Sequence, residues 1–250
     1  MAATPYIPEV VGHIARDVRA TIAGELGVQS LGDLVDEVYA LAETLTRALE
    51  EQVRSDQRRL PVCKPGCDSC CRLHAVFVTP AEALRIAAHL RAHRTPEQLA
   101  ALQRDLDALA PRIAEMTLED RAHERVPCPL LDASGACGVH PARPLLCRGY
   151  NSYDLDACLQ AFEARRPGVK LLSSVNQSSA HQSVFAGLFL GGAADGRDAG
   201  PLELIDAVRT ALSDPDSESK WLRGERVFDV EGSRISRERA AQWRDFLARS

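Results

Sequence analysis

The sequence predicts a mainly α-helical protein in which two irregular cysteine-rich loops converge on a metal or cluster site. Apolar residues recur at steps of three and four through most of the 250-residue chain, which is the spacing of one face of an α-helix. The eight cysteines are confined to residues 63–158, in two clusters among proline, glycine, aspartate and serine residues. Such segments interrupt regular structure and allow the backbone to wrap around an ion.

Residues 1–59 are predicted to form an N-terminal helical segment. Residues 9–27 alternate apolar and charged positions at helical spacing and end at Gly27, a residue favoured at helix C-termini. Ser30 is the expected N-cap of a second, long amphipathic helix over residues 31–53.

Residues 60–165 are predicted to form a cysteine-cluster metal-binding domain. The apolar residues 75–78 indicate a brief strand or a buried linker. Residues 79–82 and 95–98 each read as a helix start, with a threonine N-cap, a proline next and a glutamate or glutamine at the third helical position. Residues 154–164 are expected to be helical.

Residues 166–250 are predicted to form a C-terminal helical segment that packs with the rest as one domain. We expect a helix over 184–190 that ends at Gly191-Gly192, and another that Pro201 opens and that continues to Leu212. Ser236 is the expected cap of a last helix.

Composition excludes several classes of protein. The formal net charge of −5 does not favour a nucleic-acid partner, which usually requires a basic face. Apolar runs stay shorter than the roughly 20 residues that span a bilayer, so we expect no membrane segment. A signal peptide begins with a basic region followed by an apolar region, and the first residues contain neither. We therefore expect a cytoplasmic protein without a signal peptide. A protein partner stays open.

In a reducing cytosol, clustered cysteines favour metal ligands or catalytic thiols over disulfides. The spacing of Cys63, Cys67 and Cys70 lets one loop supply three ligands, with a fourth from elsewhere. Side chains of adjacent residues point to opposite sides of an extended backbone, so Cys70 and Cys71 either face two neighbouring sites or Cys71 is a packed free thiol. The candidate metal ligands are Cys63, Cys67, Cys70, Cys71, Cys128, Cys137, Cys147 and Cys158.

Some of these residues have alternative interpretations. Cys158 shares a predicted helix face with Leu155 and Phe162, so it is either a ligand or a core residue. His140 lies between two cysteines and is either a fourth ligand or a packing residue. The spacing of the first loop also occurs in radical S-adenosylmethionine enzymes, but their alternation of strands and helices is missing here.

Together the two cysteine regions resemble the YkgJ-like cysteine-cluster family, a zinc- or iron-chelating domain. Its signature is a C-x3-C-x2-C-C loop, then C-P-x-L, Gly-x-Cys and Tyr-x-x-Arg-Pro-x-x-Cys-Arg. The resemblance covers about residues 60–160, and His140 stands where the family usually has tyrosine. The matching residues are Cys63, Cys67, Cys70, Cys71, Cys128, Pro129, Cys137, Arg143, Pro144, Cys147 and Arg148.

The resemblance implies a metal-binding protein, and two classes of function follow. The first is a protein that holds an iron–sulfur cluster or zinc, with iron–sulfur favoured because thiolates dominate and a Cys-Pro pair of the ferredoxin type is present. Arg143 and Arg148 would then offset thiolate charge and tune the reduction potential. The alternative is an S-adenosylmethionine-dependent enzyme, because flagellin lysine N-methylases carry a similar cysteine domain. A glycine-rich strand–turn–helix fingerprint is not visible, so the sequence does not decide whether the protein is an enzyme.

Overall fold

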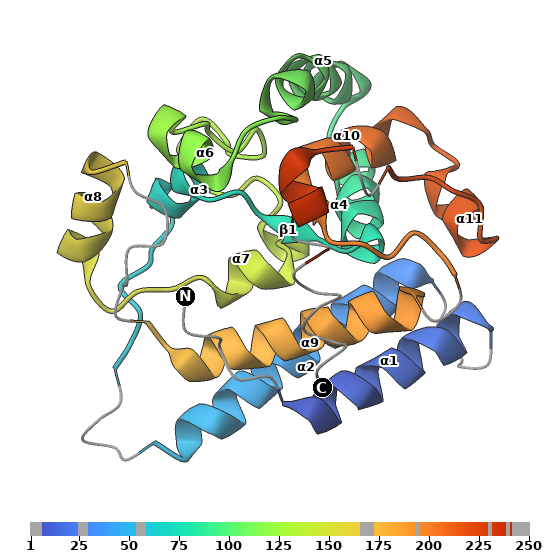
Figure 1. Cartoon of the computed structure of the whole chain (residues 1–250), viewed down its shortest axis with the longest axis horizontal. Helices are drawn as coiled ribbons and strands as arrows, with labels where there is room; N and C mark the ends of the chain where they lie inside the picture. Colours follow the sequence, from blue (N-terminus) through green and yellow to red (C-terminus); the bar gives the residue numbers. More distant parts are fainter. Residues whose placement is uncertain are drawn as a thin grey trace.

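The computed structural model describes residues 7–24, 30–53, 59–165, 173–193, 196–229, 232–238 and 241. Helices make up most of this part of the chain, with one two-stranded sheet, which confirms the predicted mainly α fold. Figure 1 shows a lower layer of three long helices, an upper group of helices, and a set of short helices at one end.

The lower layer packs α9 against both other long helices. Its members are α1 (Pro8–Ile22), α2 (Leu31–Glu51) and α9 (Val175–Ala193). Ser30 caps α2 as predicted, because its hydroxyl accepts a hydrogen bond from the Asp33 amide. Helix α1 ends earlier than predicted, since Gly24 adopts a left-handed conformation (φ 75°), while the predicted cap Gly27 lies outside the described residues.

Helix α9 is longer than predicted at both ends and runs through Gly191-Gly192 instead of ending there. These glycines serve close helix packing. A Cβ atom on Gly187 would lie 2.5 Å from the Cβ of Ile14, and one on Gly191 would lie 2.5 Å from the Cβ of Val18. Only glycine lets α1 and α9 approach this closely, so the expectation of a C-cap at this position was wrong.

The upper group places α10 against both α4 and α5. Its helices are α4 (Pro80–His93), α5 (Pro96–Ile113), α10 (Leu204–Ser213) and α11 (Ser217–Leu222). The predicted threonine caps of α4 and α5 are confirmed, and both are complete capping boxes.

The sheet pairs β1 (Phe77–Val78) with β2 (Leu202–Glu203) in antiparallel register, Phe77 opposite Glu203. The apolar residues before α4 are therefore a brief strand. The expectation that Pro201 opens a helix through Leu202 was wrong, because α10 starts at Leu204 with Glu203 as its N-cap. The last described helical turn follows Ser233, whose hydroxyl accepts from the Ser236 amide, so Ser233 occupies the role expected of Ser236.

The short elements carry the cysteine region, with α7 lying on α9. They are α3 (Ser69–Leu73), α6 (Leu118–Glu124), η1 (His140–Ala142), α7 (Leu145–Gly149) and α8 (Leu155–Glu163). Residues 126–150 contain no long regular element, as predicted.

Residues from all three predicted segments share one hydrophobic cluster, for example Val35, Leu145, Phe185 and Val208, each fully buried. Burial of these apolar side chains stabilises the fold and supplies a fixed frame for the cysteine region. Within the described part of the chain, no helix combines the length and apolar character needed to cross a membrane.

Candidate metal centre

The first cysteine loop begins exposed and turns into a short helix. Cys63 is exposed, and the Cys67 amide donates to the Lys64 carbonyl at 3.0 Å across a turn in which Gly66 has φ 83°. Helix α3 then carries Cys70 and Cys71. The loop thus presents its thiols along a turn followed by one helical turn.

The thiol of Cys71 raises the pKa of the neighbouring Cys70 thiol. The extended backbone assumed for this pair was wrong, because both residues lie in helix α3. In a helix, successive side chains are separated by about 100°, so the two neighbouring thiols can meet.

The second loop is a tight hairpin between Cys128 and Cys137. Leu131 pairs with Cys137 in an isolated β-bridge, and the Asp132 amide donates to the Ala136 carbonyl at 2.8 Å. The Asp132 carboxylate also accepts from the Ala136 amide at 3.0 Å. These bonds fold the segment back on itself between the two cysteines.

The two loops touch each other directly. The Cys128 amide donates to the Cys71 carbonyl at 3.0 Å. A Cβ atom on Gly66 would lie 3.5 Å from the Ser134 carbonyl oxygen, and one on Gly135 would lie 3.5 Å from the Gly66 carbonyl oxygen. Both glycines have positive φ, a conformation that other residues adopt only with strain. The glycines therefore bring the two clusters together.

Helix α7 holds Cys147 and is fixed at both ends. The Leu145 amide at its start donates to Oε1 of the buried Glu82 at 2.8 Å. At its end, Gln177 of α9 donates to the Arg148 carbonyl at 2.7 Å. Sequence reasoning did not connect Glu82 with the cysteines, because only its place in a capping box marks it in the sequence.

The two arginines of the motif lie beside α7 and bind mainly main-chain oxygens. Arg143 donates to the Cys147 carbonyl, and Arg148 donates to the carbonyls of Arg143 (2.6 Å) and Pro141 (2.8 Å). Arg148 also pairs with Glu43 at 2.8 Å. The two arginines thereby connect the segment before Cys147 to α7 and to α2.

Several thiols have a raised pKa. Burial raises the pKa of Cys128 and of Cys147 to about 12, although Arg143 acts in the opposite direction on Cys147. The hydrogen bond from Cys71, followed by burial, raises the pKa of Cys70. These thiols are therefore protonated at neutral pH in the metal-free protein, and metal binding would release protons.

The thiols also affect one another's pKa. After burial, the thiols of Cys70, Cys63 and Cys158 contribute to the raised pKa of Cys67. Contact between α3 and α8 brings Cys158 into this group.

A second group consists of Cys128, Cys137 and Cys147. Cys147 and Cys137 raise the pKa of Cys128 after burial, and Cys137 also raises the pKa of Cys147. Cys70 acts on Cys147 as well, so the two groups adjoin. The structure thus gathers cysteines from both predicted loops and from α8.

All eight cysteines are free thiols, so the donor chemistry fits zinc or iron. Among the residues that the structure describes, however, no three His, Cys, Asp or Glu side chains stand in an arrangement that could hold a metal ion.

Residues 62–167 match the family model CxxCxxCC, described as "Putative zinc- or iron-chelating domain". The predicted cysteine-cluster family is confirmed, and the matched range contains all eight cysteines. No curated protein and no solved structure matches the chain. The family description covers both zinc and iron.

Two of the histidines near the motif have packing roles. His74 follows α3 and stacks on Tyr150, which follows α7, with ring centroids 4.9 Å apart. His181 is buried and its Nδ1 lies 2.9 Å from the Gln177 carbonyl. His140 is exposed at the start of η1.

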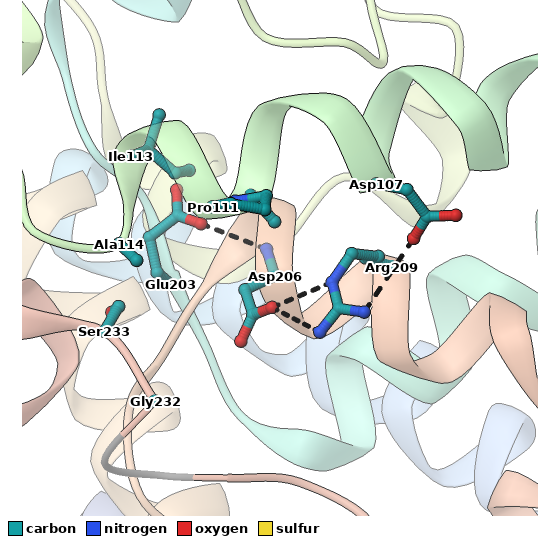
Figure 2. A pocket seen from close by; sticks show the side chains of 10 residues that line it. Asp107, Pro111, Ile113, Ala114, Glu203, Asp206, Arg209, Gly232 and Ser233 are labelled. Atoms are coloured by element: carbon teal, nitrogen blue, oxygen red, sulfur yellow. Dashed lines mark hydrogen bonds and ion pairs between the residues drawn. The ribbon is translucent and has the colours of Figure 1, made fainter.

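A cavity of about 240 Å³ lies between α5, α10 and residues 232–233 (Figure 2). Arg209 sits between two acidic residues, 2.8 Å from Asp206 and 3.8 Å from Asp107. Glu203 in the wall accepts from the amide of Asp206 at 3.1 Å. Among the described residues that line this cavity none is a cysteine. Arg209 pairs with Asp206 and Asp107, while Glu203 pairs with the buried Arg121 outside the lining at 3.4 Å.

Proposed function

We propose that the chain binds an iron–sulfur cluster through thiolates of both cysteine loops. The observation that carries this proposal is the direct contact between the two loops, whose cysteines are free thiols from elements far apart in sequence. Buried cysteines with neighbouring cysteines are costly to ionise, and a bound cation offsets the repulsion between their thiolates.

We further propose two ligand sets of four. The first set surrounds Cys67, and the second surrounds Cys128, with Cys71 added because its carbonyl bonds the Cys128 amide. Four cysteines are enough for one four-iron cluster or one zinc ion. The proposed sets are Cys63, Cys67, Cys70 and Cys158, and Cys71, Cys128, Cys137 and Cys147.

Iron–sulfur is proposed over zinc because the donors are all thiols and a cation lies beside them. Arg143 acts to lower the pKa of both Cys70 and Cys147, against the larger raising effects of burial and of Cys71, and so favours their thiolates. A positive charge at this position would also raise the reduction potential of a bound cluster.

Anaerobic purification followed by iron, sulfide and zinc assays tests this function. We expect brown protein that contains iron and acid-labile sulfide in equal amounts. Colourless protein with zinc and no iron would overturn the iron–sulfur choice and keep the metal site. Protein that stays free of both metals after reconstitution would overturn the metal-binding function.

We propose that this protein is cytoplasmic, where reduced thiols persist, and that it binds neither nucleic acid nor membrane, while a protein partner stays open. The net charge of −5 supports the exclusion of nucleic acid. The alternative, an S-adenosylmethionine-dependent enzyme, stays a prediction, which a binding titration with S-adenosylmethionine would test.

A further inference from the structure

Glu82 is a fully buried carboxylate that serves two helices at once. It is the third residue of α4, and its Oε2 accepts from the Thr79 amide at 2.9 Å and from the Thr79 hydroxyl at 3.1 Å. These bonds complete the capping box of α4. A capping box needs one carboxylate oxygen, which leaves Oε1 for other donors.

Oε1 reaches two other elements. It accepts from the Leu145 amide at 2.8 Å, across 63 positions of sequence, and lies 3.5 Å from the hydroxyl of Tyr39 in α2. Leu145 is the first residue of α7, whose N-cap residue Pro144 makes no side-chain cap. A five-residue helix has little stability of its own, and its first amides need acceptors.

We propose that Glu82 is a positioning residue for Cys147: its bond to the Leu145 amide fixes the start of α7 and thereby the place of Cys147 in the metal site. Cys147 lies two residues after this bond, within the same helical turn. The metal-dependent part of this inference rests on the proposed function, and the placement of Cys147 does not.

The chain contains natural controls for the local role of Glu82. In α5 the same box uses Gln98, which accepts from the Thr95 amide at 3.0 Å. In α6 it uses Asp120, which accepts from the Thr117 amide at 2.8 Å. Glutamine and aspartate therefore both complete a capping box in this protein.

Two substitutions separate the cap from the link to α7. Glu82→Gln keeps one side-chain oxygen for Thr79 but turns its NH2 group toward the Leu145 amide. Both groups are donors, so the hydrogen bond to Leu145 is lost. Glu82→Asp keeps the charge and the cap but is one methylene shorter, so it loses its reach to Leu145. Gln98→Glu in α5 is the matched control, because it makes the reverse exchange in a box that is exposed.

The experiment compares the full-length wild type with these three variants. Metal release to a chelator is measured on purified protein, and the alkylation rate of each cysteine is measured by mass spectrometry on metal-free protein. For both Glu82 variants we expect metal release at least about 10-fold faster, the usual effect of losing a partner that orients a ligand. We expect Cys147 to be alkylated several-fold faster relative to Cys63, and Gln98→Glu to behave as wild type.

Three outcomes would overturn the inference. Unchanged relative alkylation of Cys147 would show that Glu82 does not position it. Equal acceleration at all eight cysteines would show a role in general stability only. If Glu82→Gln changes metal release and Cys147 alkylation while Glu82→Asp does not, the charge of Glu82 matters and its reach to Leu145 does not. If Glu82→Gln does not fold, metal release and Cys147 alkylation in Glu82→Asp alone test the inference. If wild type holds no metal, the proposed function fails, while the alkylation pattern still tests the position of Cys147.

Discussion

Helices α3 and α7 are equally short, with five residues each, and both carry cysteines of the motif. They differ in what holds them. Helix α7 is bonded at its start to Glu82 of α4 and at its end to Gln177 of α9, so both layers of the fold fix it. Helix α3 contacts α6 and α8, which are themselves peripheral, and its Arg72 pairs with Asp68 of the same segment. One half of the site is therefore held by both layers of the fold, and the other half is held by peripheral helices only.

Removal of the metal should affect the two halves unequally and is the largest effect we expect. Chelation should lower the melting temperature by about 10 °C, since each kcal/mol corresponds to about 2–4 °C for a chain of this size. Hydrogen exchange should accelerate in residues 63–73 far more than in α7. An unchanged melting temperature with the metal lost would show that the helices hold the cysteine region without it.

A single substitution, which adds a Cβ atom to Gly66, should weaken the contact between the two cysteine loops. Gly66→Ala should destabilise the protein by about 1–2 kcal/mol, because φ is 83° at this position. Relief of this strain would shift the turn against Ser134, 3.5 Å from the new Cβ, and should therefore also speed metal release. Gly24→Ala is the matched control, with φ 75° and open space around it. Thermal melts should show a similar loss for both variants. Equal metal release from the two would contradict the role given to the contact.

The stability of the metal-free protein should depend on pH, a smaller effect that reports on the thiols of the second loop and of α7. The pKa values of Cys128 and Cys147 are about 12 in the fold, against 9.0 for a free thiol. Folding therefore favours the neutral thiols, and this stabilisation is complete below about pH 9 and is lost as the pH rises toward 12. Denaturant unfolding of the wild type and of Cys128→Ser from pH 8 to 11 should show a steeper decline for the wild type. Parallel curves would contradict burial of this thiol.

The parts of the fold that sequence predicts are those that local chemistry decides. The caps Ser30, Thr79 and Thr95 were predictable because each bonds an amide three residues away. The strand at Leu202 was not, because two residues carry no periodic pattern and their partner lies more than a hundred residues earlier. Gly191 was misread as a cap because its reason, contact with Val18, is long-range.

The same limit applies to the site. Spacing and resemblance predict the cysteine ligands, but they do not predict which thiols become neighbours. That Cys158 joins Cys67 depends on contact between α3 and α8, and that Cys71 meets Cys70 depends on a helical turn that the loop composition hides. Whether the eight thiols form the two proposed sets stays a prediction.

Metal content per chain across a small set of variants tests the central claim most directly. The set is wild type, Cys67→Ser, Cys128→Ser and the double variant, purified anaerobically and analysed for iron, sulfide and zinc. Two sets of four ligands predict that each single variant keeps about half of the wild-type metal and that the double variant keeps none. Wild-type metal content in Cys67→Ser, or complete loss in both single variants, would contradict the account.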